Sequence, residues 1–110
     1  MKKEFDVFKE EFNKWYKKFE LSQFRIYFEE DKKQTPHAEI FTYHEDGYAL
    51  VKFNPDADST FINPKYSAKH EAIHLLISDL SDLASSRYIT SSELVEAEEK
   101  LVNKLEKLIQ

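Results

Sequence analysis

The chain opens with aromatic residues at the spacing of a helix. Between residues 5 and 19 they recur three or four positions apart, as Phe5, Phe8, Phe12, Trp15 and Phe19. This spacing places all five on one face of an amphipathic helix, and packing into the core is the simplest role for that face. We expect the helix to end at residues 21–23.

Three short segments rich in aromatic and branched residues follow the first helix. They predict strands over residues 24–29, 38–43 and 48–53, with a polar loop at 30–36 between the first two. The tripeptide Glu45-Asp46-Gly47, which contains the only glycine of the chain, separates the second strand from the third. Because Asp-Gly between two alternating runs is a strong hairpin signal, these two strands are expected to be antiparallel neighbours.

Two helices are expected to complete the chain. Residues 54–64 contain two prolines and predict a loop before a helix, for which Ser67 is the candidate N-cap. The last helix is expected to start near residue 91, with Ser91 or Ser92 as its cap, and to run to the C-terminus. The order helix, three strands, helix, helix predicts one α+β domain over residues 1–110. It would have one layer of mostly antiparallel sheet and one layer of helices.

Composition narrows the chemistry that this domain can carry. The 110 residues suit a single core, and the absence of cysteine excludes disulfides, thiol catalysis and cysteine-based zinc sites. A net charge of −5, with lysines interleaved among glutamates, argues against a nucleic-acid partner. No apolar run approaches the roughly 20 residues of a membrane helix, and the N-terminus lacks the apolar region of a signal peptide. We therefore expect a cytoplasmic protein without a membrane partner.

Residues 70–74 form the motif His-Glu-Ala-Ile-His within the predicted second helix. Residues four apart lie one above the other on a helix, so His70 and His74 can reach one metal ion from the same side. Glu71 is rotated by about 100° from His70. From there its carboxylate can take a proton from a water that the metal activates, without being a ligand itself.

The residues around the motif favour this interpretation over a chance match to a pattern that fixes only three positions. An apolar stripe at helical spacing predicts that one side of the helix is buried, and it comprises Ile73, Leu76, Ile77, Leu80 and Leu83. His70 and His74 fall beside this stripe, at the rim of a buried helix rather than in a solvated tail. His37 and His44 are expected to be ordinary loop or strand residues.

A third metal ligand is expected on the last helix, because catalytic zinc sites use three protein ligands. On a helical wheel, Glu98 lies at the centre of the apolar face of that helix. A buried carboxylate has to pair with a cation or coordinate a metal, and zinc would satisfy this need. A protonated carboxyl, or a salt bridge to Arg25 or Arg87, is the alternative. Glu99, at the edge of the same face, is the alternative ligand.

Two histidines of a His-Glu-x-x-His motif and a glutamate on the next helix resemble the gluzincin type of zinc peptidase. The small size is similar to minimal members of that group, including short phage-type proteins. The resemblance covers about residues 69–108; residues 69–76 are its specific part and 98–102 its weaker part. It implies Zn²⁺ held by His70, His74 and Glu98, with Glu71 as general base and acid in the hydrolysis of a peptide or protein substrate. It also implies an edge strand that pairs with an extended peptide above the active-site helix, either the third strand or whichever strand borders the cleft.

The residue that would stabilise the oxyanion has no sequence signature. Tyr88 is preferred because it lies in the connection between the two ligand-bearing helices, although core packing is an equal alternative role for it. Tyr66, His44 and Arg87 are the other candidates. Two other functions stay open: a small interaction or regulatory module whose zinc site is structural or vestigial, and a metal-free binding domain in which the motif is coincidence.

Overall fold

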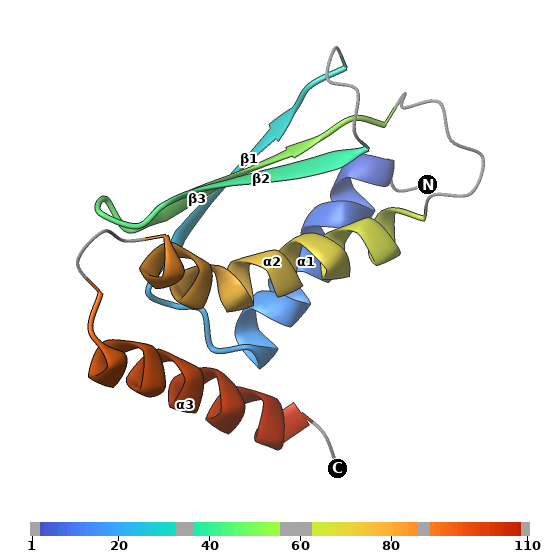
Figure 1. The fold of residues 1–110 in the computed structure, drawn as a ribbon. Helices are drawn as coiled ribbons and strands as arrows, with labels where there is room; N and C mark the ends of the chain where they lie inside the picture. The colour runs from blue at the N-terminus through green and yellow to red at the C-terminus, as the bar shows by residue number, and fades with distance from the viewer. Residues whose placement is uncertain (1–2, 33–36, 56–62, 86–88, 109–110) are drawn as a thin grey trace.

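A computed structural model describes residues 3–32, 37–55, 63–85 and 89–108 of the chain (Figure 1). Its elements are α1 (Glu4–Lys18), β1 (Arg25–Glu30), β2 (Ala38–Tyr43), β3 (Tyr48–Phe53), α2 (Pro64–Ala84) and α3 (Ser91–Leu108). The predicted α+β class and element order are confirmed. The second and third strands have the predicted bounds, and the first is displaced by one residue.

The three strands form a mixed sheet in the order β1-β3-β2. β2 and β3 are antiparallel, as the hairpin signal predicts, and Gly47 adopts a φ of 69° in the turn between them. β1 pairs with β3 in parallel, so "mostly antiparallel" describes only one of the two pairings. This arrangement puts β3 in the middle and leaves β2 at one edge of the sheet. The strand patterns contain no information about which side of the hairpin β1 joins.

The core lies between one face of the sheet and helices α1 and α2 (Figure 1). Phe8 and Phe12 of α1 are fully buried, which confirms the core role of the aromatic stripe. The ring of Phe28 on β1 stands edge-on to both, with centroid distances of 6.4 and 5.5 Å. Phe53 on β3 stacks on Phe8 at 4.6 Å. These contacts fix α1 against the sheet through large apolar side chains.

Helix α2 starts three residues earlier than its expected cap. Asn63 is the N-cap, and its side chain accepts a hydrogen bond from the backbone N–H of Lys65 at 2.9 Å. Pro64 follows at the first helical position, where its missing N–H costs nothing. The prediction of Ser67 as the cap is therefore wrong; Ser67 lies inside the helix and is buried.

The buried face of α2 also differs from the predicted one. Its buried residues are Ser67, Ala68, Glu71, Ala72, Leu75, Leu76 and Ser78. Ile73 and Ile77, which were expected to be buried, are 41% and 37% exposed. The small side chains of Ala68 and Ala72 let the backbone of α2 approach its neighbours closely, so this face turns inward and the isoleucines turn out.

Helix α3 runs back along α2, on the side away from the sheet (Figure 1). Thr90 caps it: its hydroxyl accepts the N–H of Glu93 at 3.2 Å and donates to the Glu93 carboxylate at 2.9 Å. The N-cap is therefore Thr90, one residue before Ser91 and two before Ser92, so neither predicted cap residue is the cap. The side chains of α3 that are partly buried are Leu94, Ala97, Leu101, Lys104 and Leu108, and no described residue of α3 is fully buried.

Candidate metal and catalytic site

The two histidines of the motif meet on the exposed side of α2. Their Nε2 atoms are 3.2 Å apart, and the rings cross edge to face with centroids 4.8 Å apart. Two nitrogens that each lie about 2.0–2.1 Å from a tetrahedral zinc ion would be about 3.3–3.4 Å apart. The observed separation of His70 and His74 therefore fits two ligands of one metal ion.

Glu71 points away from solvent, into the space between α2 and the edge strand β2. Its side chain is only 7% exposed, although the histidines on either side of it in the motif are exposed. A cleft of about 360 Å³ contains it and is lined by Ala38, Glu39, Ile40, Thr42, Glu71, His74, Ile77, Ser78 and Ser81. A smaller hollow of about 220 Å³ is lined by His37, Ala38, Tyr66, Ser67, His70 and Glu71. Glu71 thus lines both hollows, each of which also contains one histidine of the pair.

The electrostatic surroundings of Glu71 favour its protonated form. Burial, and to a smaller extent the nearby negative charge of Glu39, raises the pKa of this carboxyl group to about 7. A group with a pKa close to neutral exists in both protonation states at physiological pH. It can therefore accept a proton and give it back, which a general acid–base residue has to do.

Strand β2, rather than the predicted third strand, borders the cleft. Within the described residues it pairs only with β3, so its outer edge faces the side where Glu71 and His74 lie. An unpaired edge carries N–H and C=O groups that a further extended strand can bond. The sheet therefore presents a hydrogen-bonding edge next to the histidine pair.

The expectation that Glu98 sits on the buried face of the last helix is wrong. Both Glu98 and Glu99 are exposed, and the inward positions nearest to them are Ala97 and Leu101. Apolar residues cover so much of the α3 wheel that the wheel alone does not decide which part of it is buried. In the described part of the chain, no three His, Asp or Glu side chains are grouped to hold a metal ion. The structure thus brings His70 and His74 together but does not bring Glu98 to them.

Of the oxyanion candidates, Tyr88 and Arg87 lie outside the described residues. Tyr66 is near the pair: its ring is stacked against His70 with a centroid distance of 6.4 Å. His44 is elsewhere, with Nε2 at 3.3 Å from a carboxylate oxygen of Asp79 on the C-terminal half of α2. Tyr66 is therefore the described candidate that lies beside the site.

His37 has a positional role that the sequence did not indicate. Its Nδ1 atom is hydrogen-bonded to the hydroxyl of Ser67 at 2.7 Å, and its ring meets Phe53 edge-on at 4.8 Å. Burial lowers the pKa of His37, while the charge of Glu4 acts in the opposite direction. This contact ties the start of β2 to the first turns of α2, and so it forms one wall of the smaller hollow. A lone histidine before a strand carries no pattern from which such a contact could be predicted.

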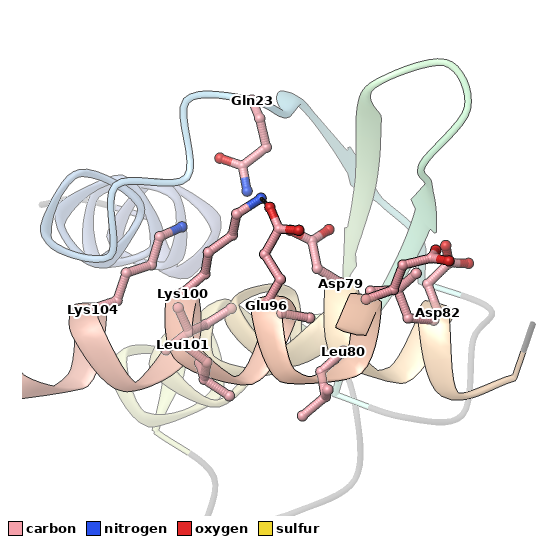
Figure 2. Close-up of a pocket in the computed structure, with 12 residues that line it drawn as sticks. Gln23, Asp79, Leu80, Asp82, Glu96, Lys100, Leu101 and Lys104 are labelled. Carbon is pink, nitrogen blue, oxygen red and sulfur yellow. Dashed lines mark ion pairs between the residues drawn. The ribbon is translucent and has the colours of Figure 1, made fainter. Parts of the chain in front are cut away.

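A hollow larger than these two lies on another side of α2, between α2 and α3 (Figure 2). It measures about 570 Å³ and is lined by Gln23, Leu76, Asp79, Leu80, Asp82, Leu83, Glu93, Glu96, Ala97, Lys100, Leu101 and Lys104. Figure 2 shows Lys100 reaching Glu96, and the two charged atoms are 3.7 Å apart. Four leucines and charged residues of both signs form most of its lining, together with Gln23 and Ala97. None of the residues singled out by the motif lines it, so its size does not mark it as the site of the chemistry.

Comparisons with models of protein families, with curated proteins and with solved structures give no match to this chain. Among the described helices, none has the length and apolar character that crossing a membrane requires. Functional inference therefore depends on the geometry of the histidine pair, Glu71 and the edge strand.

Proposed function

We propose that this chain is a very small zinc-dependent metallopeptidase that acts in the cytoplasm. The observation that carries the proposal is the 3.2 Å approach of the His70 and His74 Nε2 atoms. It is supported by the adjacent Glu71, which is buried in a cleft beneath an open strand edge. A chance pair of surface histidines needs neither a buried glutamate between them nor a cleft beside them.

His70 and His74 would supply two of the ligands of the ion. Zinc, when bound, supplies a Lewis acid that polarises a peptide carbonyl and makes water easier to deprotonate. Glu71 takes a proton from the attacking water as the oxygen–carbon bond forms. It then gives this proton to the leaving nitrogen as the carbon–nitrogen bond breaks. The same carboxyl group thus serves as base in the first step and as acid in the second.

The substrate would be a peptide or an extended segment of a protein. Its backbone would pair with the edge of β2 that no described strand covers, which borders the cleft that contains Glu71 and His74. Backbone pairing holds a peptide in a defined register without requiring a particular sequence. Tyr66, whose ring stacks against His70, is a candidate to stabilise the developing oxyanion, and Tyr88 remains the preferred candidate from the sequence.

Glu98 is proposed as the third ligand, with Glu99 as the alternative. Support comes from the gluzincin resemblance alone, because both carboxylates are exposed and neither is grouped with His70 and His74 among the described residues. Glu98→Ala should weaken zinc retention at least about tenfold, as removal of one ligand does. Glu99→Ala is the matched variant; if it weakens retention instead, Glu99 is the ligand, and if neither does, neither glutamate binds the metal.

An alternative function is a small interaction or regulatory module with a structural or vestigial zinc site. The observation that favours it is that only two metal-binding side chains converge among the described residues. Catalytic zinc needs three protein ligands and one open position. A protein that binds zinc yet cleaves no peptide would support this alternative.

Metal analysis tests the site directly. Wild-type protein reconstituted with zinc and then dialysed should retain close to one ion per chain, while His70→Ala and His74→Ala should lose it. His44→Ala is the matched control, because His44 contacts Asp79 rather than the pair. A zinc content near zero in the wild-type protein would contradict the proposed metal site.

Cleavage of unstructured peptides tests the reaction. Glu71→Gln should keep zinc and reduce the cleavage rate by about 10²–10⁴-fold, the usual contribution of a general base. Glu106→Gln, an exposed change on α3, is the control for loss of a carboxylate. Wild-type activity in the Glu71→Gln protein would refute the role of Glu71.

A further inference from the structure

The outer face of the sheet is the second surface with a clear chemical character. Helices α1 and α2 lie on one side of the sheet, and no described element covers the other side (Figure 1). Side chains alternate along a strand, so every second residue points outward. The outward residues are Arg25, Tyr27 and Glu29 on β1, Tyr48, Leu50 and Lys52 on β3, and Glu39, Phe41 and Tyr43 on β2. We call these nine residues the outer sheet face.

Aromatic rings dominate this face. Tyr27, Phe41 and Tyr43 are 50%, 37% and 41% exposed. Tyr48 joins them, since its ring stacks on Tyr43 at 4.6 Å and meets Tyr27 edge-on at 5.6 Å. Single exposed apolar side chains are ordinary, but a contiguous patch with a polar rim marks an interaction surface. Tyrosine and phenylalanine are also enriched at protein interfaces.

The strand register arranges the outer sheet face in three rows. In order β1, β3, β2, the rows are Arg25-Tyr48-Tyr43, then Tyr27-Leu50-Phe41, then Glu29-Lys52-Glu39. The middle row is apolar apart from the tyrosine hydroxyl. The first row has a positive charge at its β1 end, and the last row has a negative charge at each end. The face has two positive and two negative groups, and the Asp31 carboxylate beside it lies 3.8 Å from the Lys52 Nζ atom, so it has no excess positive charge with which to attract a polyanion.

We propose that a second copy of this chain packs on the outer sheet face, with a two-fold axis that crosses the strands at Leu50. This rotation places the first row of each copy over the last row of the other. Arg25 of one copy then faces Glu29 of the second copy, and each such ion pair occurs twice. The middle rows of the two copies pack against each other around Leu50.

The remaining positions of the two rows are also complementary in this arrangement. Lys52 of one copy lies over the ring of Tyr48 in the other, which is a cation–π contact. The hydroxyl of Tyr43 faces the carboxylate of Glu39, to which it can donate a hydrogen bond. Two sheets packed face to face keep their strands within about 30° of each other, which this two-fold axis permits.

The other two-fold axis that aligns the strands runs along them, and it gives the opposite result. It would place Glu29 of one copy over Glu39 of the other, and Lys52 over Lys52. Like charges that face each other across an interface are destabilising. The order of charges on the outer sheet face thus selects the axis that crosses the strands.

The size of the face determines the strength to expect. Strand spacing and residue rise make it about 14 by 20 Å, which is smaller than the surface that a stable interface buries. The dimer should therefore be weak and form at high protein concentration. Sedimentation equilibrium up to about 1 mM, where a weak complex is populated, should show a monomer–dimer equilibrium. A wild-type protein that stays monomeric at that concentration overturns the proposal.

Charge reversal tests the pairing of rows. Arg25→Glu and Glu29→Arg should each raise the dissociation constant at least about tenfold, because each replaces two attractions with two repulsions. The double variant Arg25→Glu/Glu29→Arg regenerates the pair across the axis, and its constant should return to within a few-fold of wild type. Lys17→Glu, an exposed charge reversal on α1, should change nothing. A dimer that neither single variant weakens, or that the double variant does not restore, contradicts this contact.

Cross-linking gives a readout that does not depend on these ion pairs. The chain has no cysteine, so Leu50→Cys introduces a single thiol next to the axis. The axis places this thiol close to the same thiol in the second chain, so a short bis-maleimide should link the two chains efficiently. Ile77→Cys, exposed on α2, is the matched control and should link poorly. Equal yields from the two positions would place the contact elsewhere and overturn the proposal.

Discussion

Helices α2 and α3 both carry residues of the proposed metal site, but they are held in different ways. α2 buries Ala68, Ala72 and Leu75 completely or almost so, against a core that includes Phe8 and Phe12 of α1. α3 has no fully buried side chain among its described residues. Burial of large apolar side chains is the main source of stability, so the orientation of α2 is fixed much more strongly than that of α3.

This difference explains which part of the site is already assembled. His70, His74 and Glu71 share one helix, and the buried face of that helix sets their directions. Glu98 depends on the rotation of a helix that is held by partly buried leucines. His70, His74 and Glu71 can therefore be placed without a metal, while Glu98, the proposed third ligand, needs a further contribution to its position.

The largest effect on stability is expected from a substitution in the core against which α2 packs. Phe12→Ala should reduce the free energy of unfolding by about 3–5 kcal/mol, since it removes a fully buried ring and leaves a cavity. Leu101→Ala on α3 should cost less than half of that, because the leucine is only partly buried. Urea unfolding of the wild type and both variants measures these losses in the free energy of unfolding. Equal losses would show that α3 is as firmly packed as the core.

A pH-dependent effect is expected at Glu71 in metal-free protein. Its pKa is about 7 in the fold against 4.5 when solvated, so the fold binds its proton more tightly than the unfolded chain does. The contribution of Glu71 to the free energy of unfolding is therefore most favourable below pH 4.5 and is lost as the pH rises through 7. Glu71→Gln should stabilise the metal-free protein by up to about 3 kcal/mol at pH 8.5 and by little at pH 4.5.

Thermal unfolding in the presence of a chelator at these two pH values measures this effect. Glu106→Gln serves as the control, because this side chain is exposed. A stability gain for Glu71→Gln that is the same at both pH values would mean that its charge is not the cause.

A smaller effect is expected at the start of α3. Thr90→Ala removes both hydrogen bonds of the Thr90 hydroxyl, including the one that caps α3, and should cost about 1 kcal/mol. Ser92→Ala, two residues further along the chain and exposed, should cost little by comparison. Chemical denaturation, with circular dichroism as the probe, distinguishes them. If Ser92→Ala has the larger cost, the cap lies at the position that the sequence predicted.

The smallest effect is expected on the outward side of α3. Val102 is 39% exposed, so Val102→Ser should change the free energy of unfolding by no more than about 0.5 kcal/mol. The same substitution at buried Val51 of β3 is the contrasting control and should be strongly destabilising. A large loss at Val102 would indicate that the outward side of α3, which includes Glu98, is covered in solution.

Local patterns were sufficient for much of the fold and for part of the site. The aromatic stripe, the β2–β3 hairpin and the order of elements follow from spacings of two, three and four residues, which depend only on neighbours along the chain. The approach of His70 to His74 has the same origin, because residues four apart on a helix are neighbours whatever the helix packs against.

Tertiary packing decided the rest, because it depends on contacts between segments far apart in the sequence. It placed β1 beside β3, made β2 the edge that borders the cleft, and turned Ala68 and Ala72 inward in place of the isoleucines. It also buried Glu71 and left Glu98 exposed. A helical wheel shows which residues share a face, but the partner surface determines which face is buried. The sequence by itself therefore determined the histidine pair, and only the tertiary structure decided what surrounds it.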